Sequence, residues 1–480
     1  MSPLPPNPDQ TDPAGAPRSS SELRPVALCI SQSFSPDTTP TAIRASKLLE
    51  RLSADRDVVV LTESHGPRPA EHVRVEVVNS WRPNRLLALL RRLRMSKLLE
   101  LGVWPDESIF WVLPAILAAR RLIRETSPSV LVVFMMPYSS GLVGIALRRL
   151  SGLPLILTLD DSPTCTDMHP HFPTRLHFRL AKALEDLYIR RADAVVYVSQ
   201  TNLDLVSARQ PEHARGKLHL VRYGADRADF RAQPPSPESF EIAYVGAMSG
   251  WWSLIDGHAP AGVLGGLYDR WTRLGRYQRT ALDQRTSSPA IIGGAMLDAI
   301  AEHPGWEGLL SLTIYGNPYP DSVVAQALAS AGVQGVVSVF GPVAHSEVAD
   351  IIARSDLLFI TLPKRLDGSP GGRISAKTYE YLATDRPILA AVPPGENWDY
   401  LADKPGVWLV APDDRERMQA VIAELAEAKL SGMPLSFDRE HLQQEISYES
   451  RARAFAAALS AGIEHRRHSD GSTRAGRSPA

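Results

Sequence analysis

Short runs of apolar, mostly β-branched residues recur along the chain, and amphipathic helical patterns separate them. Continuous apolar runs are typical of strands covered on both faces, as in a parallel sheet flanked by helices. The first series of expected strands is Val26–Ile30, Val58–Thr62, Val73–Val78, Val130–Phe134, Leu155–Leu159 and Ala194–Val198. This alternation predicts a doubly wound α/β domain.

A second series of the same kind follows a proline-rich stretch at residues 233–237. Its expected strands are Ile242–Val245, Leu312–Tyr315, Val336–Phe340, Leu357–Ile360, Pro387–Ala391 and Val407–Val410. Two doubly wound units joined by a hinge predict a cleft between them. Ligands of such sheets bind at the carboxyl ends of the strands.

The pattern also predicts where the parts of the chain begin and end. We expect a disordered tail (1–23), a Rossmann-like domain (24–232), a hinge (233–240), a second Rossmann-like domain (241–436), a crossover helix that packs back on the first domain (437–465) and a disordered tail (466–480). Residues 249–289 separate a strand from its helix by more than an ordinary connection, which indicates an insertion.

Composition excludes some classes of protein. The 480 residues include 52 Lys and Arg against 53 Asp and Glu, so the net charge of −1 argues against a nucleic-acid-binding protein. Two cysteines are too few for a disulfide framework, and the first 22 residues have no apolar core of a signal peptide. We therefore expect a cytoplasmic location.

A glycine-rich loop precedes an expected helix in the segment from Leu366 to Leu389. Free backbone N–H groups and the positive end of the helix favour a phosphate there. Arg373 and Lys377 would supply charge to a diphosphate, and Glu380 would bind ribose hydroxyls. The alternative is an ordinary loop and helix with a surface pair of Lys377 and Glu380.

The stretch Lys377–Ala390 resembles the donor-site helix and following strand of family 4-like glycosyltransferases, which have the GT-B fold. Further segments resemble the same family in the same order: Ser35–Arg44, Ala192–Ser199, Val221–Asp226, Ala243–Gly246 and Phe340–Val343. The resemblance extends over most of residues 25–464, apart from the insertion. The resemblance supports the GT-B fold class, with two Rossmann-like domains facing across a cleft.

The resemblance implies transfer of a sugar, usually with retention, from a nucleotide-diphosphate sugar on the C-terminal domain to an acceptor on the N-terminal domain. It implies no metal and no cofactor beyond this co-substrate, and a polysaccharide, glycolipid or small-molecule product. Arg373 and Lys377 would assist departure of the diphosphate. The expected donor-binding residues are Gly246, Val343, Gly371, Gly372, Ile374, Ser375 and Glu380.

One acidic pair, Asp160-Asp161, follows the expected strand Leu155–Leu159. We assign Asp161 a catalytic role, in which it orients an acceptor hydroxyl. The alternative is a helix cap or a solvated turn.

The sequence also departs from the family's pattern. Gly372 stands where a first glutamate is often found, and Thr39-Pro40 replaces a Gly-Gly pair. No lysine lies between Lys217 and Lys364, so arginines of the insertion, Arg270, Arg273, Arg276 and Arg279, would have to neutralise the diphosphate. These departures motivate a rival, a binding or scaffold protein of the same fold. A sugar-nucleotide epimerase is a less expected rival.

Two segments suggest further contacts. The insertion interleaves Trp251, Trp252, Tyr268, Trp271 and Tyr277 with arginines, and it is either an acceptor lid or a peripheral helix packed on the C-terminal domain. Residues 82–99 group leucines on one side with flanking arginines. This pattern predicts contact with an anionic membrane, at the inner face of the plasma membrane, or else a core-facing helix with a basic edge.

Overall fold

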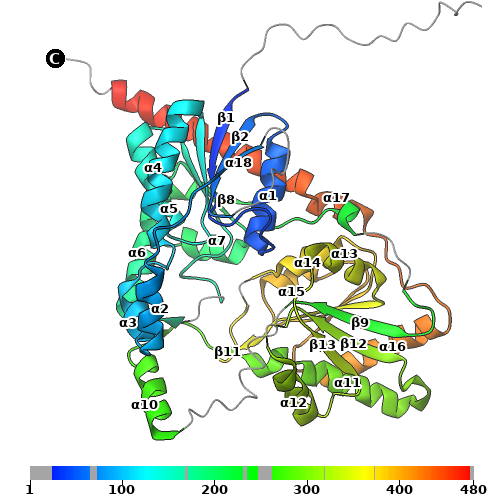
Figure 1. Cartoon of the computed structure of the whole chain (residues 1–480). Helices are drawn as coiled ribbons and strands as arrows, with labels where there is room; N and C mark the ends of the chain where they lie inside the picture. Colours follow the sequence, from blue (N-terminus) through cyan, green and yellow to red (C-terminus); the bar gives the residue numbers. More distant parts are fainter. Residues whose placement is uncertain are drawn as a thin grey trace, which may run out of the picture.

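The computed structural model describes residues 24–64, 73–167, 171–230, 235–246, 262–317, 319–371 and 373–475. Two parallel sheets, each covered by helices on both faces, form an N-terminal and a C-terminal domain (Figure 1). The predicted GT-B architecture is confirmed. Each strand expected from an apolar run is present, with ends that differ by at most two residues.

The N-terminal sheet has seven parallel strands in the order β3-β2-β1-β4-β5-β7-β8. The strands are β1 (Val26–Ile30), β2 (Asp57–Thr62), β3 (Val73–Val77), β4 (Val130–Phe134), β5 (Leu155–Leu159), β7 (Ala194–Tyr197) and β8 (Leu218–Leu220). The helices of this domain are α1 (Pro40–Leu52), α2 (Asn84–Arg92), α3 (Ser96–Gly102), α4 (Ile109–Thr126), α5 (Ser140–Ser151), α6 (Arg175–Arg191), α7 (Gln200–Ser207) and α8 (Glu212–Arg215). The strand β8 was not predicted, because it is short and has His219 at its centre.

The C-terminal sheet has six parallel strands in the order β13-β12-β9-β14-β16-β17. The strands are β9 (Phe240–Val245), β12 (Leu310–Tyr315), β13 (Val337–Phe340), β14 (Leu357–Thr361), β16 (Ile388–Ala391) and β17 (Val407–Val410). The helices are α11 (Pro289–Glu302), α12 (Asp321–Ala331), α13 (His345–Arg354), α14 (Ala376–Leu382), α15 (Glu396–Leu401), α16 (Arg415–Leu430) and α17 (Glu440–Ile446).

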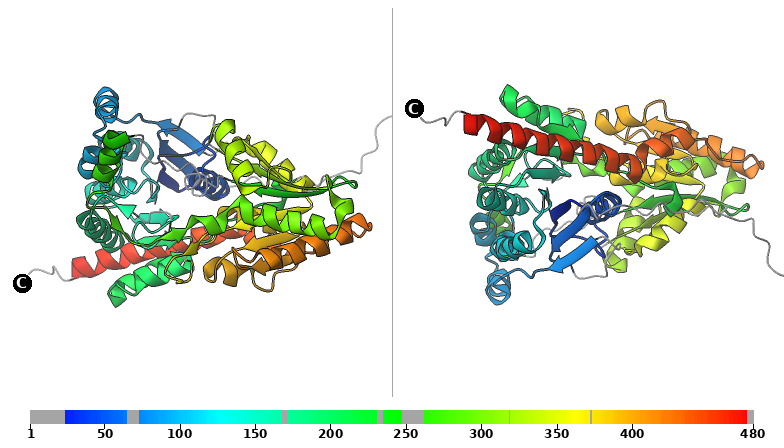
Figure 2. Two further views of the ribbon diagram at one scale, coloured as in Figure 1. Left: turned by 90° about the horizontal axis from the view of Figure 1, so that it is seen from below. Right: turned by 90° about the horizontal axis from the view of Figure 1, so that it is seen from above.

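The last helix, α18 (Tyr448–Ala475), returns to the first domain (Figure 2). Phe455 and Leu459 are fully buried in the N-terminal core, where the Phe455 ring lies 6.3 Å from that of Phe134. The helix continues to Ala475, through residues that the sequence assigned to a disordered tail. Arg466 Nε donates to the carbonyl oxygen of Gly152 at 3.2 Å, which attaches this extension to the domain.

The inserted segment crosses from the C-terminal to the N-terminal domain. Its helix α10 (Gly262–Arg273) lies beside α3, and its strand β10 (Tyr277–Gln278) pairs antiparallel with β6 (His171–Phe172) (Figure 1). The centre of the Tyr277 ring lies 4.9 Å from the centre of the Phe178 ring on α6, and the two rings are tilted by 34°. For the described aromatic residues, the expected packing on the C-terminal domain is therefore wrong. Trp251 and Trp252 lie outside the described residues.

A short pairing returns the insertion to its own domain. The strand β11 (Leu282–Asp283) pairs with β15 (Lys364–Arg365), which follows β14. In the described part of the chain, no helix combines the length and the apolar character that a bilayer-crossing segment needs. The uncharged stretch between Glu125 and Arg148 forms β4 and α5 instead.

Candidate active site

The glycine-rich loop at residues 366–375 packs against the end of β16. Gly371 N donates to the carbonyl oxygen of Pro394 at 2.8 Å, and Glu396 N donates to the carbonyl oxygen of Gly371 at 3.3 Å. Gly395 has a φ of 136°, and a Cβ there would lie 2.2 Å from the oxygen of Gly371. Glycine at 395 therefore allows the close approach that fixes Gly371. Gly372 lies outside the described residues.

Lys377 lies on α14 and points to the end of β9. Its Nζ donates to the Tyr244 hydroxyl at 2.8 Å and lies 4.0 Å from the centre of that ring. A Cβ at Gly246, whose φ is 143°, would lie 2.6 Å from this Nζ. A lysine thus stands beside Gly246 although no lysine lies between Gly246 and Lys364 in the sequence.

Three other expected donor-site residues are Ser375, Ile374 and Val343. Ser375 is the N-cap of α14 and makes no side-chain capping bond. Ile374 and Val343 pack against the apolar cluster between β14, β16 and α14. Because their side chains fill this cluster, Ile374 and Val343 can offer a ligand mainly backbone groups.

Glu380 faces the boundary between the domains. It is partly buried and lines a cavity of about 30 Å³ with Lys47, Asp229 and Tyr448. Residues of both domains and of the last helix line this cavity, so Glu380 is close to groups of the N-terminal domain in this arrangement.

Asp161 lies in the loop at residues 160–167, which follows β5. Its carboxylate accepts from the Thr166 hydroxyl at 2.8 Å, and its carbonyl oxygen accepts from the Tyr138 hydroxyl at 3.3 Å. Burial raises the pKa of Asp161 to about 6, although the Thr166 bond and the positive charge of Arg373 oppose this rise. Arg373 of the C-terminal domain therefore acts electrostatically on Asp161 of the N-terminal domain.

The neighbouring Asp160 has a different partner. Its Oδ1 accepts from Nη1 of Arg44 at 3.0 Å, and the fully buried Arg44 also donates to the Val221 carbonyl oxygen at 3.1 Å. Arg44 is on α1, whose N-cap Thr39 accepts from Ala42 N at 3.4 Å and whose first residue is Pro40. Thr39-Pro40 thus begins a helix, where the family's Gly-Gly was expected.

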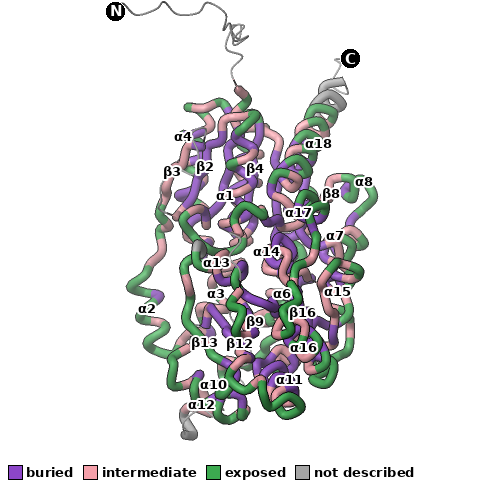
Figure 3. Tube along the Cα trace, turned by 90° about the vertical axis from the view of Figure 1, so that its right-hand side faces the viewer, coloured by how far each residue is buried: buried purple, intermediate pink, exposed green. Residues whose placement is uncertain are grey.

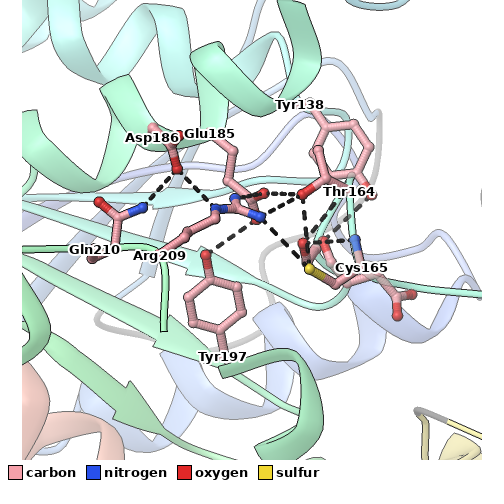
Figure 4. A network of polar contacts seen from close by, with 10 residues as sticks. Tyr138, Thr164, Cys165, Glu185, Asp186, Tyr197, Arg209 and Gln210 are labelled. Carbon is pink, nitrogen blue, oxygen red and sulfur yellow. Dashed lines mark hydrogen bonds and ion pairs between the residues drawn. The ribbon is translucent and has the colours of Figure 1, made fainter. Parts of the chain in front are cut away.

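A buried polar network around Arg209 fixes the loop at residues 160–167 (Figure 4). Arg209 donates to Asp186 Oδ1 at 2.9 Å and to Thr164 Oγ1 at 2.9 Å, and it forms an ion pair with Glu185. Thr164 in turn donates to Glu185 at 2.6 Å. These bonds fix the loop backbone next to Asp161.

Two interdomain ion pairs were not predicted. Oδ1 of Asp167 lies 2.8 Å from Nη2 of Arg365 in β15. Glu396, the first residue of α15, pairs with Arg222 and accepts from Gln200 N at 2.8 Å. Despite the opposing effect of burial, bonds from Ser199 and Arg222 hold the pKa of Glu396 below its usual value. Both Arg365 and Glu396 follow strands of the C-terminal sheet. Because ligands bind at the carboxyl ends of such strands, this position could have identified both as candidate site residues.

The inserted arginines do not gather at the glycine-rich loop. Arg279 forms an ion pair with Asp167 at 3.4 Å, and Arg276 forms one with Glu100 at 3.3 Å. Arg270 and Arg273 are exposed on α10, beside the N-terminal domain. The expectation that these arginines replace the missing lysine is not met in this arrangement, because two of them pair with carboxylates and the other two lie on or at the end of α10, which packs beside α3.

Residues 41–224 match the model of the glycosyl transferase 4-like domain. This part of the chain is similar to that family, and the match spans less than half of the chain. A curated relative, a probable glycosyltransferase WbjE of Pseudomonas aeruginosa, is 30% identical over 125 residues. The match covers 25% of this chain and 30% of the relative. The chain thus matches less than a third of that protein's length.

Solved structures resemble the whole molecule. Sucrose-phosphate synthase of Thermosynechococcus elongatus superposes with a TM-score of 0.58 at 15% identity, over 90% of this chain and 98% of that one. A putative UDP-N-acetylglucosamine 2-epimerase of Listeria monocytogenes superposes with a TM-score of 0.51 at 12% identity, over 92% of this chain and 97% of that one. At these identities the likeness shows the fold, which both enzyme classes share.

Proposed function

We propose that this protein is a glycosyltransferase that moves a sugar from a nucleotide-diphosphate sugar to an acceptor hydroxyl. The observation that supports the proposal is the electrostatic effect of Arg373, from the C-terminal domain, on the buried Asp161 of the N-terminal domain. Asp161 lies in the segment that matches the glycosyl transferase 4-like domain, and Arg373 belongs to a loop suited to phosphate. In this proposal the carboxylate serves the acceptor and the cation serves the leaving group.

The C-terminal domain holds the donor in this proposal. Arg373 and Lys377 neutralise the charge that develops on the departing diphosphate, without a metal ion. Backbone groups of Gly371, Ile374 and Ser375 bind the phosphates, and Glu380 binds the ribose. Lys377 is already oriented by Tyr244, so little rearrangement is needed when the diphosphate binds.

The N-terminal domain holds the acceptor. Ionised Asp161 accepts a hydrogen bond from the acceptor hydroxyl and orients it toward the sugar carbon. With retention, the hydroxyl attacks on the face that the diphosphate leaves, and a leaving phosphate oxygen takes the proton. The acceptor class is a polysaccharide, a glycolipid or a small molecule, and the reaction is placed in the cytoplasm.

Calorimetry with UDP-, GDP- and ADP-sugars tests the donor, and product analysis with candidate acceptors tests the transfer. We expect one nucleotide class to bind and its sugar to appear on an acceptor. Binding without transfer or isomerisation would favour the scaffold alternative. Conversion of the donor sugar into an isomer without any acceptor would instead favour an epimerase. The Glu380→Ala variant is the control, since it should weaken nucleotide-diphosphate binding in each case.

A further inference from the structure

The helices α2, α3 and α10 pack together at the edge of the N-terminal domain. The Tyr268 hydroxyl of α10 lies 3.5 Å from Ser96 Oγ of α3. Lys97 Nζ donates to the Thr272 carbonyl oxygen at 3.1 Å, and the Arg94 guanidinium lies 5.6 Å from the centre of the Tyr268 ring. The insertion therefore extends a surface that the family domain begins.

A stripe of leucines on α2 faces away from the protein. Leu86, Leu89 and Leu93 are 51% to 57% exposed, and their spacing of three and four residues places them on one side. Leu87 is the one buried residue of this helix, which is exposed over most of its length in Figure 3. The alternative of a core-facing helix is therefore wrong for α2, because Leu86 and Leu89 lie outside the core.

The inserted helix repeats this arrangement. Leu267, Trp271 and Leu274 are 44% to 63% exposed and are spaced by four and three residues. Arg270 and Arg273, also exposed, flank this stripe. Two neighbouring helices thus present apolar residues with arginines beside them.

Charge decides which partner fits. In a chain with a net charge of −1, the exposed basic residues of these helices and their ends are Arg85, Arg91, Arg92, Arg94, Arg270 and Arg273, of which Arg91 pairs with Glu107. Two copies of this face would bring like charges together, which disfavours self-association. An anionic bilayer accepts both features, because leucine and tryptophan enter the acyl boundary while arginine binds headgroup phosphates.

We propose that α2, α3 and the inserted α10 form one docking face for an anionic lipid bilayer. The insertion is then a membrane-binding addition rather than a lid over the donor. This assignment does not depend on sugar transfer, and it places the N-terminal domain against the lipid surface. Lipid-linked acceptors would reach that domain directly.

Sedimentation with phosphatidylcholine–phosphatidylglycerol vesicles tests the docking face. We expect the wild type to bind these vesicles at low salt and to dissociate from them at high salt. It should not bind vesicles of pure phosphatidylcholine. The variants Leu86→Ser/Leu89→Ser/Leu93→Ser and Leu267→Ser/Trp271→Ser/Leu274→Ser should each bind roughly tenfold or more weakly. The matched control Leu150→Ser/Leu205→Ser/Met433→Ser changes equally exposed residues elsewhere and should bind normally.

Melting temperatures show that each variant is folded. Should a serine variant fail to fold, Arg85→Glu/Arg92→Glu/Arg270→Glu, which changes exposed residues alone, tests the same face. Vesicle binding that is absent in the wild type, or unchanged in the folded variants, would overturn the proposal. A loss confined to the α2 variant would exclude the insertion from the face. Self-association of the wild type without vesicle binding, abolished by the same variants, would instead identify an interface between copies.

Discussion

Replacing Asp161 by Asn separates the stability of the protein from its activity. Burial raises the pKa of Asp161 from its ordinary value of 3.8 to about 6. At about 1.36 kcal/mol per pKa unit, ionisation of this group costs the folded protein about 3 kcal/mol at neutral pH. Asparagine carries no charge, keeps the shape of the side chain and can still accept the Thr166 bond. Asp161→Asn should therefore be more stable than the wild type at pH 8.

The sign of the pH dependence follows from the raised pKa. Between about pH 4 and pH 6 the folded wild type binds more protons than the unfolded chain, so its stability falls as the pH rises through this window. The advantage of Asp161→Asn should thus be near zero at pH 4 and complete above pH 7. Urea unfolding followed by tryptophan fluorescence measures it.

Activity should change in the opposite direction. Because the ionised carboxylate orients the acceptor, wild-type turnover should fall as the pH drops through about 6, and Asp161→Asn should have little turnover at any pH. The control Asp367→Asn removes an exposed carboxylate whose pKa hydrogen bonds with Ser369 hold below its usual value, so it should gain no stability at high pH. Equal stability of Asp161→Asn and the wild type at pH 8, or an advantage that persists at pH 4, would refute the reasoning.

Four further substitutions test the remaining parts of the site. Glu380→Ala should weaken nucleotide-diphosphate binding at least about tenfold, since a charged hydrogen bond contributes about 1.5–3 kcal/mol; an unchanged Kd in calorimetry argues against a ribose contact. Arg373→Ala and Lys377→Ala should lower kcat more than they raise KM in steady-state assays, because charge builds in the transition state; full turnover in both excludes the role. Glu396→Ala should lower the free energy of unfolding by about 3 kcal/mol at pH 7, measured by urea unfolding, since it leaves Arg222 without its carboxylate. This loss should shrink at acid pH, below the lowered pKa of Glu396, because the wild-type carboxylate is then protonated and no longer pairs with Arg222. An undiminished loss at low pH contradicts the ion pair.

The strands of both sheets could be predicted from the sequence because their signal is local. A run such as Val130–Phe134 is apolar at each position, which only a strand covered on both faces requires. The glycine-rich loop and the family segments were readable for the same reason. Two of the site's positive charges, Arg373 and Lys377, could thus be named without coordinates.

Distances between residues far apart in the sequence were decided by the tertiary structure. Lys377 reaches Gly246 only because α14 and β9 lie next to each other, and Arg373 acts electrostatically on Asp161 only because the two domains face one another. Neither the composition of the insertion nor its aromatic spacing indicates that it pairs with β6 of the other domain. Local patterns fix which residues are buried in an element, whereas the partner of a charged or exposed side chain depends on how the elements pack.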